Sequence, residues 1–256
     1  MARTRRPRPT PGLPLLDIPF RQPRPSRPPY DWLSADDLER IHDASLTILE
    51  TVGIDFLDDE ALDLWQRAGA RVDRAERRVR IDRDLLLPTI ATTPRSFRWR
   101  ARNPAHDVVI GGGALAFGPC GGMAYAADLD RGRRPGTMAD YENLLRLSQS
   151  CHALHFAAWE QVTAQDVAVN VRHLHRVRAA FRLTDKVVME AAHGRVIPAD
   201  TLAMMRLVYG DLDGDPVTGD VINVNSPLRY DERMLGGLIS YARAGQVTFI
   251  TPFRCV

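Results

Sequence analysis

Polar side chains that could do chemistry follow each of four apolar, strand-like segments in the second half of the sequence. In chain order they are Glu160, Gln161, Glu190, Asn225, Ser226, Thr251 and Pro252. Active sites of parallel α/β proteins lie at the carboxyl ends of the strands, so these groups are expected to converge on one mouth. Each residue alone has a second explanation, since it could cap the next helix or bond to loop backbone. Taken as a set, they favour a functional site.

The two glutamates suggest which ligand this mouth could take. Glu160 and Glu190 could bind a cationic ammonium group, because a carboxylate in a partly dry pocket attracts such a cation strongly. Tyr125 and Trp159 could add cation–π contacts to the same group. With Asn225 and Thr251, these residues form a candidate substrate site.

A glycine-rich segment, DVVIGGGALAFGPCGG at Asp107–Gly122, permits two interpretations. Gly111, Gly113 and Ala116 follow an apolar strand in the dinucleotide-binding spacing G-x-G-x-x-A, and Asp130 lies near the expected ribose-binding position. That interpretation needs a helix to begin inside the loop, where a proline costs about 3 kcal/mol. The residues that oppose this helix are Gly118, Pro119, Gly121 and Gly122. We therefore expect a hairpin or loop whose backbone approaches a ligand or another element closely, and we add its glycines Gly118, Gly121 and Gly122 to the candidate substrate site.

The histidines and cysteines do not suggest a metal site. Cys120, Cys151 and Cys255 lie far apart without a C-x-x-C motif, which indicates neither a thiolate metal site nor a disulfide framework. The remaining candidates fail on position, because two point different ways on a helix and two precede a strand rather than follow it. These are His173 with His175, and His152 with His155. We expect no metal, and a reducing, cytoplasmic location.

Strands and helices that would position these groups alternate from residue 154 to residue 251. Strands are expected at Leu154–Trp159, Lys186–Met189, Asp220–Val224 and Val247–Thr251. Helices are expected between them at Asp166–Phe181, Ala199–Tyr209 and Glu232–Ala244. The spacing of about 30 residues matches a βαβ unit, so the pattern predicts a parallel sheet, either open or part of a barrel.

The first part of the chain shows a different organisation. Residues 1–33 are expected to form a disordered basic tail, since residues 1–30 hold nine prolines and seven arginines against one aspartate. Residues 34–150 are expected to form a helical and β-rich region, and residues 151–256 the parallel unit. Helices are predicted at 34–53, 58–69, 82–91 and 137–150, with β-like sequence at 97–100, 107–110 and 114–129.

Composition excludes several classes of protein. The chain of 256 residues is 45% hydrophobic and 26% charged, which is typical of a globular protein. No apolar stretch reaches the roughly 20 residues that cross a bilayer. The basic residues concentrate in the tail and leave the rest mildly acidic, so we expect no nucleic-acid partner.

Five blocks of sequence resemble the trimethylamine:corrinoid methyltransferase (MttB-like) family, in family order. They are LETVGIDFLDDEALDLWQRAGARVD (Leu49–Asp73), FRWRARNPAHDVVIGGGALAFGP (Phe97–Pro119), GRRPGTMADYENLLRLSQS (Gly132–Ser150), NSPLRYD (Asn225–Asp231) and YARAGQVTFITPF (Tyr241–Phe253). None is a catalytic signature by itself, but together they span nearly all of the expected folded chain.

The resemblance implies a TIM-type (β/α)₈ barrel preceded by a helical and β-rich region. It also implies transfer of a methyl group from a methylated amine, such as trimethylamine or glycine betaine, to the cobalt of a separate corrinoid protein. The chain itself would bind no cofactor, since the corrinoid (cobalamin) belongs to the partner. Such an enzyme must hold a poor methyl donor in line with the acceptor and exclude water.

The sequence departs from the family pattern in reaching only the fourth expected barrel strand. We expect a barrel truncated to about four strands, catalytically silent by itself and prone to form homo-oligomers through its exposed strand edges. Two rivals remain open: a non-catalytic half-barrel fragment that pairs with another half, and an oxidoreductase that binds a dinucleotide at Gly111–Ala116.

Overall fold

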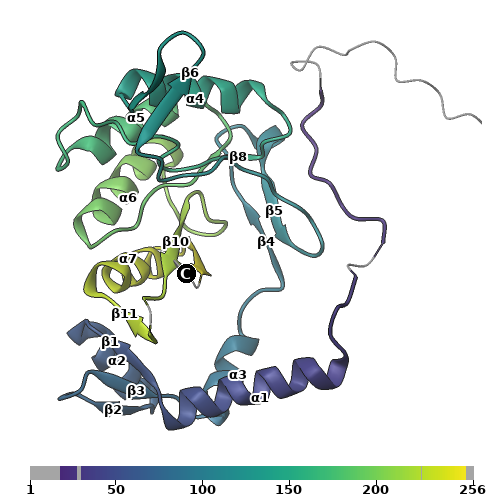
Figure 1. Ribbon diagram of the computed structural model, residues 1–256, viewed down its shortest axis with the longest axis vertical. Helices are drawn as coiled ribbons and strands as arrows, with labels where there is room; N and C mark the ends of the chain where they lie inside the picture. Colours follow the sequence, from purple (N-terminus) through teal and green to yellow (C-terminus); the bar gives the residue numbers. More distant parts are fainter. Residues whose placement is uncertain (1–17, 28–29, 226, 252–256) are drawn as a thin grey trace, which may run out of the picture.

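The computed structural model describes residues 18–27, 30–225 and 227–251 and shows a mixed α/β protein (Figure 1). Ser226, Pro252 and most of the expected tail lie outside the described residues. In the described part of that tail, Gln22 is hydrogen-bonded to the main chain of Val109 in both directions, at 2.6 and 2.9 Å. The Phe20 ring lies 5.4 Å from that of His155. This stretch has no helix or strand but is attached to the folded body.

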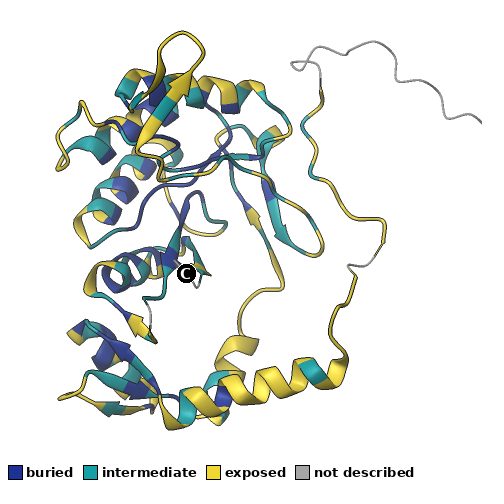
Figure 2. Cartoon of the chain, viewed as in Figure 1, coloured by how far each residue is buried: buried dark blue, intermediate teal, exposed yellow. Residues whose placement is uncertain are grey.

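Local capping signals determine the first two helices. Helix α1 (Ala35–Thr51) begins after Ser34, whose hydroxyl accepts the Asp37 N–H, as the sequence predicts. Helix α2 (Asp59–Ala68) is capped by Asp58 and ends at Gly69, whose φ of +95° suits glycine. Helix α3 (Arg83–Ala91) follows after a short hairpin. Figure 2 shows α1 mostly exposed, in contrast to α7 (Glu232–Arg243), where buried and intermediate residues predominate.

A small four-stranded sheet joins an early segment of the chain to a late one. Its order is β11–β1–β3–β2, formed by Arg229–Tyr230, Ile54–Phe56, Arg78–Arg80 and Arg71–Asp73. The sequence did not predict these four strands, which are only two or three residues long. The Phe56 and Tyr230 rings stack with centroids 5.5 Å apart, in a core shared with α6 and α7.

Two hairpins and a helix form the middle of the chain. Strands β4 (Ser96–Trp99) and β5 (Val108–Gly111) pair antiparallel, joined by the 3₁₀ turn η2 (Pro104–His106). Trp99, the last residue of β4, is buried against the rings of Phe156 and Phe249. Its ring centroid lies 5.7 and 5.6 Å from theirs. Strands β6 (Tyr125–Asp128) and β7 (Gly132–Pro135) form the second hairpin, which precedes helix α4 (Met138–Ser150).

The strand–helix repeat predicted for the second half is present. Its elements are β8 (Phe156–Ala157), α5 (Arg172–Leu183), β9 (Val187–Val188), α6 (Val196–Tyr209), β10 (Gly219–Asn223), α7 (Glu232–Arg243) and β12 (Val247–Thr251). Strands β8 and β9 pair in parallel, as do β10 and β12. The Glu190 N–H donates to the Gly219 carbonyl at 3.0 Å, which links the two pairs. The described strands form small sheets and no closed barrel.

Helix α5 begins at Arg172, six residues later than the sequence predicts. The carboxylate of Asp166 accepts the N–H of Met138 at 2.8 Å, at the start of α4. Asp166 therefore caps a neighbouring helix instead of beginning its own. The intervening residues form turns that lead into α5.

The expected β-rich stretch 114–129 forms a strand only at Tyr125–Asp128. Its preceding residues are extended and bond to distant segments: Leu115 N–H donates to the Pro23 carbonyl at 2.9 Å, and the Phe117 carbonyl accepts from His155 N–H at 2.7 Å. No helix begins within the described residues 111–122. The strand–turn–helix that a dinucleotide site requires is thus not formed at this fingerprint.

The chain's single lysine, Lys186, binds carbonyl oxygens at and just after the C-terminal end of α4. Lys186 is 1% exposed, and its Nζ donates to the carbonyl oxygens of Ser148, Cys151 and Leu154 at 2.6, 2.8 and 2.9 Å. Carbonyls at a helix C-terminus lack partners within the helix, so a buried cation there satisfies several at once. Burial lowers the pKa of Lys186 to about 8. Within the described ranges, no helix combines the length and apolar character that a membrane crossing requires.

Candidate functional site

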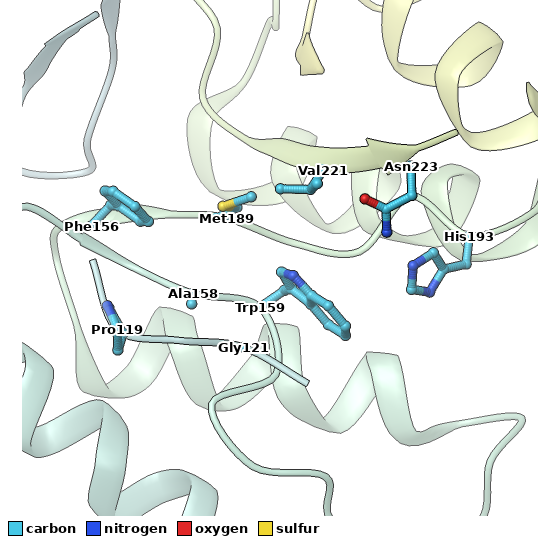
Figure 3. Close-up of a pocket in the computed structure, with 9 residues that line it drawn as sticks. All are labelled: Pro119, Gly121, Phe156, Ala158, Trp159, Met189, His193, Val221 and Asn223. Carbon is cyan, nitrogen blue, oxygen red and sulfur yellow. The ribbon is translucent and has the colours of Figure 1, made fainter. Parts of the chain in front are cut away.

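A cavity of about 550 Å³ lies at the carboxyl ends of β8, β9 and β10 (Figure 3). Its walls come from three parallel strands, the turns that follow them and the glycine-rich segment. The lining residues are Pro119, Gly121, Phe156, Ala158, Trp159, Met189, His193, Val221 and Asn223. Most of these side chains are apolar or aromatic, as in small-molecule sites.

Strand alternation decides which residues reach this cavity. Successive side chains on a strand point to opposite faces, so Val221 and Asn223 of β10 line the cavity while Ile222 packs among the helices. The same rule holds just after β9, where Met189 lines the cavity and Glu190 is directed at α5. The cavity face of the sheet is therefore mainly apolar.

Glycines bring the loop close to the aromatic wall. A Cβ atom on Gly118 would lie 2.2 Å from Cε2 of Phe156, and one on Gly121 would lie 3.3 Å from Nε1 of Trp159. Gly122, at a φ of +85°, donates its N–H to the Glu160 carbonyl at 2.6 Å. The glycines expected at the site therefore position the backbone against Phe156 and Trp159.

Thr251 reaches the cavity through Asn223. Strand β12 pairs with β10 so that Thr251 lies beside Asn223, and its hydroxyl donates to Asn223 Oδ1 at 2.5 Å. This bond leaves the Asn223 Nδ2 hydrogens as the free end of the amide.

His193 is the ionisable residue that lines the cavity. Its ring lies 5.4 Å from that of Trp159 in an edge-on arrangement. Burial lowers the pKa of His193, and the charges of Arg233 and Arg176 lower it further. The imidazole is therefore neutral at neutral pH, with one N–H donor and one acceptor nitrogen.

The two glutamates expected to bind an ammonium group are already paired. Arg176 of α5 lies 3.3 Å from Glu160 and 3.1 Å from Glu190, and both Arg176 and Glu190 are almost fully buried. Burial raises the pKa of Glu190 to about 7, although the guanidinium opposes this shift. Both glutamates are therefore engaged by Arg176, whose Cζ lies 5.9 Å from the centroid of the Trp159 ring.

The other expected site residues lie elsewhere. Tyr125 lines a separate, more polar cavity, and its ring is covered by the Arg133 guanidinium at 3.7 Å. Asn225 bonds to Asp231 at 3.0 Å near the start of α7. Buried Gln161 accepts from the Ser148 hydroxyl at 2.9 Å. The structure therefore brings the expected glycines and Trp159 together at the cavity, and it links Thr251 to the cavity by a hydrogen bond to Asn223. Tyr125, Glu160, Gln161, Glu190 and Asn225 do not line this cavity.

Sequence reasoning missed most of the lining residues, among them His193, Met189 and Asn223. The residues expected at the site are polar ones that follow each strand, whereas Met189 and Asn223 lie in or next to the strands themselves. The two-residue alternation could have found them, had the inward face been assigned first. His193 lies in the turn after β9, where periodicity carries no information.

The histidines near the N-terminal end of β8 are structural. His155 is 1% exposed; its Nδ1 accepts the Phe117 N–H at 3.0 Å and its Nε2 donates to the Arg21 carbonyl at 2.9 Å. His173 is buried against Asp200 of α6 at 2.8 Å, whereas His175 is exposed. In the described portion of the chain, no three His, Cys, Asp or Glu side chains are grouped to hold a metal ion.

The chain is an α/β protein with a parallel strand–helix unit and an aromatic cavity at the strand ends, which is where proteins of this class ordinarily bind small molecules. Comparison with known families is more specific. The model of the family described as trimethylamine methyltransferase (MTTB) matches residues 3–256, and the chain belongs to this family, which makes it a member of a methyltransferase family of enzymes.

Individual relatives carry more detailed names. A glycine betaine methyltransferase of Desulfitobacterium hafniense (strain Y51) is 35% identical over 226 residues, covering 87% of this chain and 47% of the relative. Trimethylamine methyltransferase MttB of D. hafniense (strain DSM 10664 / DCB-2) is 29% identical over 216 residues, covering 83% and 43%. A proline betaine:corrinoid methyltransferase of Eubacterium limosum is 39% identical over 69 residues, covering 27% and 14%. The chain thus spans less than half the length of these relatives.

Proposed function

We propose that this chain forms the substrate-holding part of an enzyme that transfers a methyl group from a methylated amine to a corrinoid held by a partner protein. The observation that carries the proposal is the apolar, aromatic cavity at the strand ends of a chain in the trimethylamine methyltransferase family. Two relatives are named for methylated amines, and a third is named for a corrinoid as well.

The cavity suits a methylated ammonium group for two physical reasons. The face of Trp159 attracts a cation through its ring quadrupole, worth about 0.5–2 kcal/mol depending on desolvation. Phe156, Met189 and Val221 offer apolar contacts for the methyl groups and exclude water from them. This chain would bind, orient and desolvate the donor, while the corrinoid acts as the acceptor substrate brought by the partner.

The arrangement of strands and helices supports the hypothesis that the whole protein folds as a (β/α)₈ barrel. Four parallel strands with three intervening helices, and a cavity at their carboxyl ends, match one half of a (β/α)₈ barrel. The remaining half would then supply the opposite wall of the cavity. A cytoplasmic location and a homo-oligomeric state stay predictions from the sequence.

Binding is tested with two ligands of the same shape that differ in charge, choline and 3,3-dimethylbutan-1-ol. Isothermal titration should show choline binding at least about threefold more tightly, and Trp159→Leu should remove this preference. Trp32→Leu is the matched control, because Trp32 is 88% exposed and is not among the residues that line the cavity. Equal affinity of the wild-type chain for both ligands would contradict an ammonium site.

Transfer itself is tested with ¹³C-methyl-labelled amines and a reduced corrinoid protein. A new methyl resonance that grows as the amine signal declines supports the proposal. Tight amine binding without any transfer, in protein that contains both halves of the barrel, would overturn methyl transfer and leave only a binding module.

A further inference from the structure

Helix α1 carries a row of exposed, mostly apolar residues along one side. Its members follow one another at steps of three and four residues, which is the spacing of two heptads. We call this row the α1 seam; it consists of Leu38, Ile41, Ser45, Ile48 and the C-cap residue Val52. Leu38 and Ile41 are each 55% exposed, and Figure 2 shows α1 as mostly exposed. Side chains at this spacing lie on one face of a helix, which is the face that packs against a second helix in helix pairs.

The α1 seam does not face the rest of the described chain. Helix α1 is attached through its other side, where Leu46 is buried and Arg83 of α3 lies 2.8 Å from both Asp43 and Glu50. With about 3.6 residues per turn, these three residues of α1 are rotated to the side opposite the seam. Two heptads are too short to hold a free coiled coil together, but α1 is already held in place, so a partner need not supply the free energy of helix formation.

A second copy of the seam is complementary to the first. A twofold axis near Ser45 would exchange Ile41 with Ile48 and Leu38 with Val52, so that each apolar side chain meets an apolar side chain of the other copy. The small side chain of Ser45 at this axis allows the two helices to approach closely.

A hollow beside the seam fits the same arrangement. It has a volume of about 380 Å³ and lies along the N-terminal half of α1, lined by Leu33, Asp37, Arg40, Ile41 and Ala44. Because the twofold axis places the partner's Ile48 opposite Ile41, that side chain would enter the hollow. Filling it would remove apolar surface of both copies from water.

The charges at the two ends of the α1 seam are opposite in sign. Asp36 and Asp37 lie in the first turn of α1. At the other end, Arg80 of β3 donates to the Thr51 carbonyl at 3.0 Å and has no carboxylate partner among the described residues. Asp37 and Thr51 are two heptads apart and therefore lie on the same edge of the seam. An antiparallel pair of α1 helices brings Asp37 of each copy near the partner's Arg80, and it sets the two helix dipoles in opposite directions.

We propose that the α1 seam is a dimer interface, at which a second copy of this chain packs its own α1 in the antiparallel direction. The partner is identified by the twofold match of apolar positions and by the pairing of Asp37 with Arg80. This contact does not involve the cavity at the strand ends, so it holds whether or not the proposed amine site is correct. It also differs from the strand edges through which the sequence predicts self-association.

Sedimentation equilibrium of the wild-type chain should show a reversible monomer–dimer equilibrium. Ile41→Glu combined with Ile48→Glu should raise the dimer dissociation constant at least about a hundredfold, because four isoleucines leave the interface and four carboxylates enter it. Leu207→Glu is the matched control, since Leu207 is an 87% exposed residue of α6 outside the seam, and it should leave the dissociation constant unchanged. A wild type that stays monomeric, or a dimer that survives the double substitution, would overturn the proposal.

Charge reversal tests which ends of the two helices meet. Asp37→Arg and Arg80→Glu should each weaken the dimer by about tenfold, because each replaces two ion pairs of the twofold contact by repulsion. The two changes together should recover most of the loss, since the pairs form again with their signs exchanged. Strictly additive losses would show that Asp37 and Arg80 do not meet and would refute the antiparallel pairing.

Cross-linking locates the twofold axis. In a Cys120→Ser background, Ser45→Cys should be joined to its copy by a short bismaleimide, whereas Thr47→Cys, exposed on the other side of α1, should not. Joining of Thr47→Cys alone would refute the seam as the interface. Dissociation of the dimer by Ile250→Glu at the exposed edge of β12, and not by the α1 substitutions, would assign self-association to the strand edge instead.

Discussion

The substitution Asp220→Asn should make the stability of this protein much less sensitive to pH. Asp220 of β10 is fully buried; one carboxylate oxygen accepts the Ala192 N–H, and the other has no partner among the described residues. Burial raises the pKa of Asp220 from 3.8 to about 7, despite backbone hydrogen bonds that favour the charged form. Asparagine keeps the shape and an oxygen for Ala192 but does not titrate.

The direction of the effect follows from proton counting. Between pH 4 and pH 7 the unfolded chain releases the Asp220 proton and the folded chain retains it, so raising the pH favours unfolding. The stabilising contribution is complete below pH 4 and is lost as the pH rises through 7. A difference of about three pKa units corresponds to about 4 kcal/mol at most. Glu190, whose pKa is also raised to about 7, adds a fall of the same sign in both proteins.

Urea unfolding followed by tryptophan fluorescence at pH 4 to pH 8 measures this effect. The free energy of unfolding of the wild type should fall more steeply than that of Asp220→Asn, with the gap between the curves changing by about 2–4 kcal/mol across the range. Asp213→Asn, at an exposed position in the loop before β10, is the control and should follow the wild type. Parallel curves for the wild type and Asp220→Asn would refute the reasoning.

Three further substitutions test the packing around the site. Gly237→Ala should cost about 3 kcal/mol or more in urea unfolding, because its Cβ would lie 1.5 Å from the backbone carbonyl oxygen of Ala192. Gly236→Ala meets first the side chain of Arg195 rather than a backbone atom and should cost less, so equal costs would contradict this. Lys186→Met should lower stability by about 3 kcal/mol or more, since three buried or partly buried carbonyls lose their donor. An unchanged melting temperature would argue against that role. Arg176→Met should lower the free energy of unfolding by about 3–5 kcal/mol at pH 8, because it leaves buried carboxylates unpaired. Adding Glu190→Gln should recover part of this loss, and strict additivity of the two changes would show that the two residues do not interact.

Local signals in the sequence determined the helices and the repeat. Ser34, Asp58 and Thr137 accept backbone N–H groups within three residues of themselves, so their capping role depends on near neighbours alone. The alternation of strands and helices after residue 154 is likewise a local property of apolar spacing. Family membership follows from the same blocks of sequence, because it needs no coordinates.

Contacts between distant segments decided the rest. Strand β11 pairs with β1 across more than 170 residues, and Asp166 caps α4 across 28, so no local window contains either partner. The candidate site shows the same division. The sequence placed Glu190 correctly at the end of a strand. Which face of the sheet its side chain occupies depends on the strand register and on the ion pair with Arg176.

The sequence by itself therefore determined where elements begin, which residues follow each strand and that glycines let the loop approach closely. Only the tertiary structure decided that Glu160 and Glu190 pair with Arg176, and that His193 and Asn223 line the cavity instead. The physical reason is that a one-residue change of register moves a side chain to the opposite face of a strand. Side-chain direction is thus settled by long-range packing, which local spacing does not encode.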